Sequence, residues 1–296
     1  MRTPEQPDIF RPEQLHFDEV VGSFDFDELD NSVNDLARDV GYYDTPPRSL
    51  RSGSFHEGTA DQKGVYDPGS KRIGLGIRKI EQDALVADID SEKLAEHVII
   101  HEEVHAISGQ HCFDILRKDI FDINRFEKDA QIGFDRTKGS SRVYRLWNEG
   151  VTEKLARETY RKYALAKHSA TEEEINIYMA KVKEYGHKTN EFYQPEVDLV
   201  DGFIERVAKG VGIDSTLVWK AIKQGLVRGE EWHATEFAEL ARDILPSNFM
   251  DDVERLSTHR TAQRLIQELS RVKAKGVIRS SKIVRKIKRV IEKIRL

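Results

Sequence analysis

Apolar side chains recur at helical spacing along much of this chain. In residues 27–40 four of them fall three or four positions apart, which predicts an amphipathic helix. A longer helix is predicted from Ser91, a candidate N-cap, to Gly109, a candidate C-cap. Further helices are indicated after Thr171, which opens a capping-box sequence, and after Asp214, another candidate N-cap. The chain beyond Ser91 is therefore expected to be almost entirely helical.

Strand signals lie ahead of these helices. Residues 1–27, rich in proline and acids, and residues 45–63, rich in proline, glycine and serine, indicate irregular structure. Residues 64–77 place two short strand-like runs on either side of a turn sequence at 67–70, which predicts a β-hairpin. The pattern as a whole predicts an α+β protein, with a small β-rich N-terminal part and a mostly helical C-terminal part.

Composition narrows the class of protein. The 296 residues include 39% hydrophobic and 33% charged side chains, so the chain is polar yet long enough to bury a sizeable core. No apolar run approaches the ~18–20 residues that cross a bilayer, and the first residues lack the apolar stretch of a signal peptide. The single cysteine, Cys112, excludes an internal disulfide and fits a reducing compartment. We therefore expect an intracellular, cytoplasmic protein without a signal peptide.

Candidate chemistry lies within the helix predicted from Ser91. Residues 101–105 read His-Glu-Glu-Val-His, with the two histidines at positions i and i+4. Positions four apart lie one above the other on an α-helix, so both imidazoles can bind one tetrahedral Zn²⁺ ion. Glu102 would project beside the open metal position and take a proton from the attacking water. His97, one turn earlier, is more typical of a core or supporting histidine. Two histidines on an ordinary buried helix are the alternative, and a third ligand would decide.

A candidate third ligand follows in residues 147–153, Trp-Asn-Glu-Gly-Val-Thr-Glu, at the start of another helical stretch. Glu149 and Glu153 stand at i and i+4, so their like charges face the same way. Burying both on one helix face requires a cation or a proton between them. The alternative is a solvated acidic face, which needs no ligand.

With these two motifs the chain resembles the gluzincins, zinc metallopeptidases whose third ligand is a glutamate on a second helix downstream of His-Glu-x-x-His. Thermolysin-like members carry Asn-Glu-x-x-Ser-Asp on that helix. Residues 148–153 match it, with Thr152 for serine and Glu153 for aspartate. The resemblance implies a zincin-like fold and the hydrolysis of peptide bonds by a metal-activated water.

The resemblance also implies a role for each residue of the two motifs. His101, His105 and Glu149 would bind Zn²⁺. Glu102 would be the general base, and Glu153 would orient a ligand histidine from behind. A donor for the oxyanion of the tetrahedral intermediate is expected as well. The candidates in the sequence are Tyr144, Tyr185, Tyr193 and His233.

On this interpretation the chain has four parts. Residues 1–62 form an acidic, irregular segment with one helix, residues 63–170 the zincin catalytic core, residues 171–270 a helical subdomain, and residues 271–296 a basic amphipathic tail helix. The expected partner is a peptide or protein substrate, and no specific nucleic acid is predicted. The alternatives are a zincin-fold binding or scaffold protein without activity, and a membrane-surface module that uses the tail.

The tail carries a signal of its own. Residues 271–296 contain eleven Lys and Arg against one acid, although the whole chain has a net charge of −5. In residues 277–296 the apolar side chains form one stripe along a helix, with cations flanking it. Three roles stay open: packing on the acidic body, binding to an anionic membrane surface, or docking at an acidic cleft to restrain the peptidase.

Overall fold

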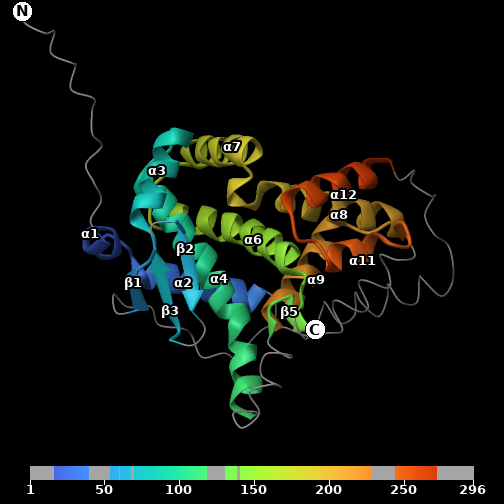
Figure 1. Cartoon of the computed structure of the whole chain (residues 1–296). Helices are drawn as coiled ribbons and strands as arrows, with labels where there is room; N and C mark the ends of the chain where they lie inside the picture. Colours follow the sequence, from blue (N-terminus) through green and yellow to red (C-terminus); the bar gives the residue numbers. More distant parts are fainter. Residues whose placement is uncertain are drawn as a thin grey trace, which may run out of the picture.

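A computed structural model of the chain describes residues 17–39, 54–59, 61–67, 70–118, 131–138, 141–228 and 244–271 (Figure 1). The basic segment 277–296 and His233 lie outside these residues. The three roles considered for the tail, and His233 as an oxyanion donor, therefore stay predictions.

Helices make up most of the described structure. In chain order they are α1 (Phe17–Gly22), α2 (Phe26–Asp39), α3 (Ile77–Ala87), α4 (Ser91–Lys118), α6 (Arg145–Ala166), α7 (Glu172–Thr189), α8 (Gln194–Val211), α9 (Ser215–Arg228), α11 (Phe249–Glu254) and α12 (His259–Arg271). A 3-10 turn, η2 (Glu191–Tyr193), lies between α7 and α8. Within the described ranges, no helix combines the length and the apolar character needed to cross a membrane.

Two small sheets accompany the helices in the described part of the chain. In the first, β3 (Arg72–Leu75) lies between β1 (Phe55–Glu57), which is parallel to it, and β2 (Gly64–Asp67), which is antiparallel. The second is an antiparallel meander of β4 (Gln131–Ile132), β5 (Asp135–Lys138) and β6 (Ser141–Val143). The predicted hairpin is confirmed as β2 and β3, and helices with small sheets agree with the predicted α+β class.

Two elements form where the sequence indicates irregular structure. β1 lies inside residues 45–63, and α1 lies inside residues 1–27. Both depend on long-range packing, because Phe55 of β1 is 2% exposed and α1 buries Val20 and Val21. Segments of three and six residues are too short to show a periodic signal. β1 therefore pairs with β3 of the predicted catalytic core, although its own residues fall within the predicted N-terminal segment 1–62.

The ends of α4 differ from those predicted. Gly109 is not a C-cap, because α4 continues beyond it. A glycine inside a helix costs only about 1 kcal/mol relative to alanine, so it does not by itself end one. At the other end Ser91 is the first helical residue and Asp90 is the cap. Its Oδ1 accepts hydrogen bonds from the N–H groups of Glu92 and Lys93, at 2.9 and 3.0 Å.

α4 and α6 form the centre of the fold. α4 packs against α6, α3 and β2. α8 packs on α6, and α12 packs on α8. Figure 1 shows α3 and the first sheet toward one end of the molecule, and α8, α11 and α12 toward the other. This packing holds residues 101–105 of α4 against the first turns of α6. Both helices contribute fully buried apolar side chains to the core: Leu94, Ile99, Ile100 and Val104 on α4 and Val151, Leu155 and Ala156 on α6.

Two predicted helix caps are confirmed. The Oγ1 atom of Thr171 accepts from the N–H of Glu174 at 3.2 Å, and the Glu174 side chain accepts from the N–H of Thr171 at 2.7 Å. These two bonds form the predicted capping box of α7. At α9, Oδ1 of Asp214 accepts from the N–H of Thr216 at 2.8 Å.

Thr171→Ala should lower the free energy of unfolding by about 1 kcal/mol, because an N–H at the start of α7 loses its acceptor. Chemical denaturation of the variant and the wild type measures this difference. Ser257→Ala is the control, since Ser257 is exposed and lies outside the described helices and strands. An equal effect of the two substitutions would show that the capping box does not stabilise the protein.

Candidate metal centre

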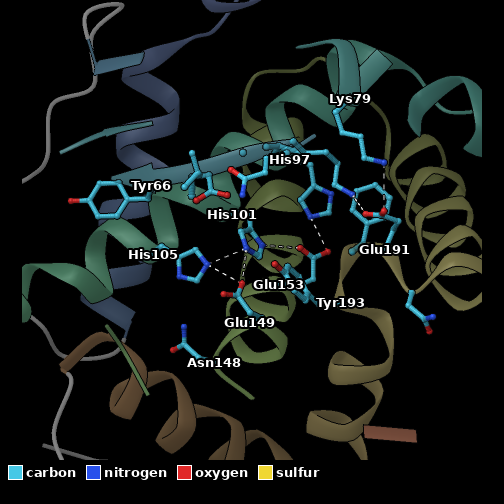
Figure 2. Close-up of a pocket in the computed structure, with 18 of the residues that line it drawn as sticks. Tyr66, Lys79, His97, His101, His105, Asn148, Glu149, Glu153, Glu191 and Tyr193 are labelled. Atoms are coloured by element: carbon cyan, nitrogen blue, oxygen red, sulfur yellow. Dashed lines mark hydrogen bonds and ion pairs between the residues drawn. The ribbon is translucent and has the colours of Figure 1, made fainter. Parts of the chain in front are cut away.

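The side chains of His101, His105 and Glu149 meet between α4 and α6 (Figure 2). The Nε2 atoms of the two histidines are 3.2 Å apart. Oε2 of Glu149 lies 3.4 Å from Nε2 of His101 and 3.1 Å from Nε2 of His105. Helical spacing places the two imidazoles side by side, with an angle of 73° between their planes, and the packing of α6 on α4 brings the carboxylate to them. This group of donors can hold a metal ion.

The spacing of these donors fits tetrahedral zinc. Bonds of about 2.0–2.1 Å at tetrahedral angles separate neighbouring ligand atoms by about 3.3–3.4 Å. The three separations found here, 3.1, 3.2 and 3.4 Å, agree with that value. Two imidazole nitrogens cannot face each other at 3.2 Å with lone pairs alone, so a cation or a shared proton belongs between them. Two histidines and one glutamate are also a ligand set of catalytic zinc sites.

Glu153 holds His101 in the tautomer that this arrangement needs. Its Oε2 accepts a hydrogen bond from Nδ1 of His101 at 3.0 Å, which leaves Nε2 to face His105 and Glu149. Oε1 of Glu153 accepts from Nε of Arg157 at 2.7 Å. Both bonds lie away from water, because Glu153 is 2% exposed. A buried carboxylate behind a ligand histidine orients the ring and makes it a stronger ligand.

The buried carboxylates of the centre have to be balanced by a positive charge. Burial disfavours the charged form of His101, yet hydrogen bonds to Glu149 and Glu153 outweigh burial and raise the pKa of His101 to about 10. Burial also opposes the ionisation of Glu149. The charge of His105 and the hydrogen bonds from both histidines nevertheless hold the pKa of Glu149 well below its usual range. Either a proton or a metal ion can supply the required charge.

Glu102 lines the same cleft and is 7% exposed. The backbone N–H of Tyr66 donates to its carboxylate. Burial, reinforced by the charge of Glu149, raises the pKa of Glu102 against the opposing charges of His101 and His105. The carboxylate is therefore held in place, and its proton affinity is raised, as the transfer of a proton requires.

His97 supports Glu153 and does not join the three donors. Its Nε2 lies 3.3 Å from Oε1 of Glu153, and its Nδ1 lies 3.0 Å from the hydroxyl of Tyr178. The ring stacks on that of Phe192, with 6.3 Å between the ring centroids. This is the supporting position expected for His97.

Asn148 ties the second sheet to the start of α6. Its Oδ1 accepts from the N–H of Phe134 at 2.9 Å. Gly133 has a φ of 58°, and a Cβ there would lie 2.5 Å from the same oxygen. The asparagine before Glu149 thus anchors the sheet to the helix, a role that the sequence motif does not reveal.

Among the candidates for an oxyanion donor, Tyr193 lies at the centre. Its ring stacks on that of His101, with 5.7 Å between the centroids and 13° between the planes. Burial and the charges of Glu149 and Glu102 raise the pKa of Tyr193 well above its usual value. Its hydroxyl group therefore keeps its proton and remains a donor.

The other two described candidates lie elsewhere. The hydroxyl of Tyr185 donates to Oδ1 of Asp83 at 3.2 Å. Tyr144 directly precedes α6 and has a left-handed backbone, with a φ of 59°. Neither tyrosine lines the cleft. The packing of α7 and α6 places these two tyrosines away from the centre. Their distance from Glu149 along the sequence does not predict this.

One residue of the cleft, His259, gives no signal in the sequence. It begins α12, and its Nδ1 lies 2.8 Å from Oε1 of Glu196 on α8. The hydrogen bond to Glu196, a fully buried residue, raises the pKa of His259 against the effect of burial. The two residues are 63 positions apart, so no helical spacing relates them.

The cleft that contains the centre has a volume of about 650 Å³ and lies along β2, α4, α6 and η2. Comparison of the chain with protein-family models, with curated proteins and with solved structures found no match. The class of protein therefore has to be inferred from the side chains of this cleft.

Glu149→Ala should sharply lower the affinity for zinc, because the loss of one of three protein ligands opens the site to water. Glu153→Ala should lower it less, by about 10–100-fold, since this residue only orients a ligand. Zinc content and competition with a chelating dye measure both effects. Glu205→Ala, on the exposed side of α8, is the control. Full zinc binding by Glu149→Ala would contradict the proposed ligand set.

Proposed function

We propose that this protein is a zinc-dependent metallopeptidase of the gluzincin type, with a zincin-like catalytic core. The observation that carries the proposal is the convergence of His101, His105 and Glu149 within 3.1–3.4 Å of one another. Two imidazoles with one carboxylate favour zinc over cations that prefer oxygen ligands. When bound, zinc supplies a Lewis acid and lowers the pKa of a coordinated water.

Glu102 is the general base in this proposal. Its carboxylate accepts a proton from the attacking water and gives it to the leaving amine nitrogen as the peptide C–N bond breaks. The N–H of Tyr66 keeps the carboxylate oriented toward the cleft, and burial raises its pKa. A purely structural zinc site needs no glutamate at this position, which argues against an inactive scaffold.

β2 provides the proposed binding surface for a peptide. It is an edge strand, paired with β3 alone among the described strands. The C=O of Lys63 accepts from the N–H of Gly76 at 3.0 Å. The alternation of antiparallel pairing then turns the N–H and C=O of Gly64 toward the cleft. An extended peptide can add to this edge as a further strand. We propose that it runs antiparallel to β2, because antiparallel pairing is slightly more stable per residue than parallel pairing.

Tyr193 and His259 are the proposed donors for the oxyanion. Both line the cleft, one as a neutral phenol and the other as an imidazole whose protonated form is favoured by Glu196. During the reaction a negative charge develops on a carbonyl oxygen. Donors that are already in place stabilise this charge and do not have to reorganise. Tyr193 is assigned the main role because it lies on the ring of His101.

Glu102→Gln should keep the fold and the zinc but lower kcat by at least about 100-fold, because the amide is nearly isosteric and cannot accept the proton of water. Mass spectrometry of a digested peptide library measures the activity, and zinc content and melting temperature are measured on the same samples. Glu205→Gln is the matched control. Substantial activity in Glu102→Gln would refute its role as base. An inactive wild-type protein with bound zinc would favour the scaffold alternative.

Gly64→Ala tests the position of the edge strand. A Cβ at Gly64 would lie 2.6 Å from Cγ1 of Val98 and 2.8 Å from Oε1 of Glu102. The substitution should move β2 away from α4, lower kcat/KM by about 10–100-fold and lower the free energy of unfolding by about 1–3 kcal/mol. Gly22→Ala is the control, since a Cβ there meets no atom within 4 Å. Unchanged kcat/KM for Gly64→Ala would show that substrate binding does not depend on β2.

A further inference from the structure

Four charged side chains form a cluster at one end of the cleft, and three of them, Lys63, Lys79 and Glu191, line it. Lys63, just before β2, forms an ion pair with Glu191 of η2, and both residues line the cleft. Nζ of Lys79 on α3 lies 3.5 Å from the same carboxylate. The two ammonium groups also contact Asp83, which is 1% exposed, at 3.1 and 2.6 Å. Because the Lys63–Glu191 pair links the start of β2 to η2, a peptide chain could pass between these two elements only if it broke the pair.

This end of the cleft lies near Glu102, where the proposed reaction occurs. Gly64, which lies against Glu102, directly follows Lys63 in the chain. Figure 2 shows Lys79 and Glu191 on the side of the centre opposite Tyr66. A substrate that is cleaved beside Glu102 therefore has space for only a short stretch of chain on the side of the lysines.

The direction of strand addition decides which end of the substrate meets the lysines. β2 runs from Gly64 to Asp67, so the C-terminal end of an antiparallel peptide points toward Lys63. Each lysine ammonium carries three N–H donors. Bonds to the described residues use two donors on each lysine. Nζ of Lys63 also lies over the ring of Phe192, 4.1 Å from its centroid. Within the described structure, one donor of Lys79 is thus left for a further acceptor, which would lie beside the charge of Lys63.

We propose that the protein acts on free C-termini, with the terminal carboxylate of the peptide bound by Lys63 and Lys79 and a short C-terminal fragment released beside Glu102. Water adds across one C–N bond, which leaves a carboxylate on the shortened chain and an amine on the fragment. This inference rests on the proposed peptidase function and specifies its substrate class. Internal bonds of long chains are poor substrates because a longer chain would have to break the Lys63–Glu191 pair.

A binding experiment tests this substrate class without turnover. The full-length, zinc-loaded Glu102→Gln protein is titrated in a calorimeter with short N-acetylated peptides that end in either a free carboxylate or an amide. The free acids should bind about 10–100-fold more tightly, the range expected for a hydrogen bond to a charged group. Equal affinities, or no detectable binding of the acids, would overturn the inference.

Substitution of the lysines tests the position of the carboxylate. Lys63→Met and Lys79→Met should each reduce the preference for the free acid, whereas Lys63→Arg should retain it. Lys188→Met is the matched control, because Lys188 pairs with Glu184 on the exposed surface of α7. Melting temperatures separate a lost contact from a damaged fold. A preference that persists in the double variant of Lys63 and Lys79 would overturn the inference.

Turnover separates this inference from the peptidase proposal. Wild-type protein should cleave free-acid peptides near their C-termini with a kcat/KM about 10–100-fold above that for the matching amides. Equal cleavage of internal bonds in the amides would overturn the inference and leave the peptidase intact. If neither set is cleaved, the peptidase proposal is wrong, and the binding experiment still decides whether Lys63 and Lys79 receive a carboxylate.

Discussion

The buried carboxylate of Glu153 is the charge on which the rest of the structure depends. It accepts hydrogen bonds from Arg157 at 2.7 Å and from His101 at 3.0 Å, and it lies 3.3 Å from His97. An unpaired carboxylate at this depth costs several kcal/mol, so α4 and α6 must present these donors together. Arg157 extends the network, since it also donates to the backbone C=O of Phe192 in η2, at 3.3 Å. One buried charge thus links two helices and the turn beside them.

The second constraint is the backbone of that turn. Phe192 and Tyr193 have φ values of 54° and 47°, a left-handed conformation that costs such residues roughly 1–2 kcal/mol each. Aromatic packing compensates for this cost, because Phe192 stacks on His97 and Tyr193 stacks on His101. Strained backbone that brings aromatic rings onto the histidines of a cleft is typical of functional sites.

These constraints place the charges of the cleft before any ligand arrives. Against the effect of burial, hydrogen bonds to Glu149 and Glu153 raise the pKa of His101 to about 10, so they favour a proton or another cation at this ring. A metal ion can replace the proton without a change in the positions of the donors, since they already have the spacing of a tetrahedral site. At the end of the cleft, Lys63 and Lys79 are fixed in the same way by buried or half-buried acids. Polar groups that are fixed in advance bind and stabilise charge with little reorganisation.

By itself, the sequence determined the features that depend on local spacing. Two histidines at i and i+4 in residues 101–105 face the same way on any α-helix, and the capping box of α7 at Thr171 involves neighbouring residues alone. Only the tertiary structure decided that Tyr193, and not a tyrosine nearer to Glu149, lies on a histidine of the centre. It also decided that Lys63 meets Glu191, which is 128 positions away. Such contacts arise when separate helices and strands pack together, and no periodicity in the sequence relates their residues.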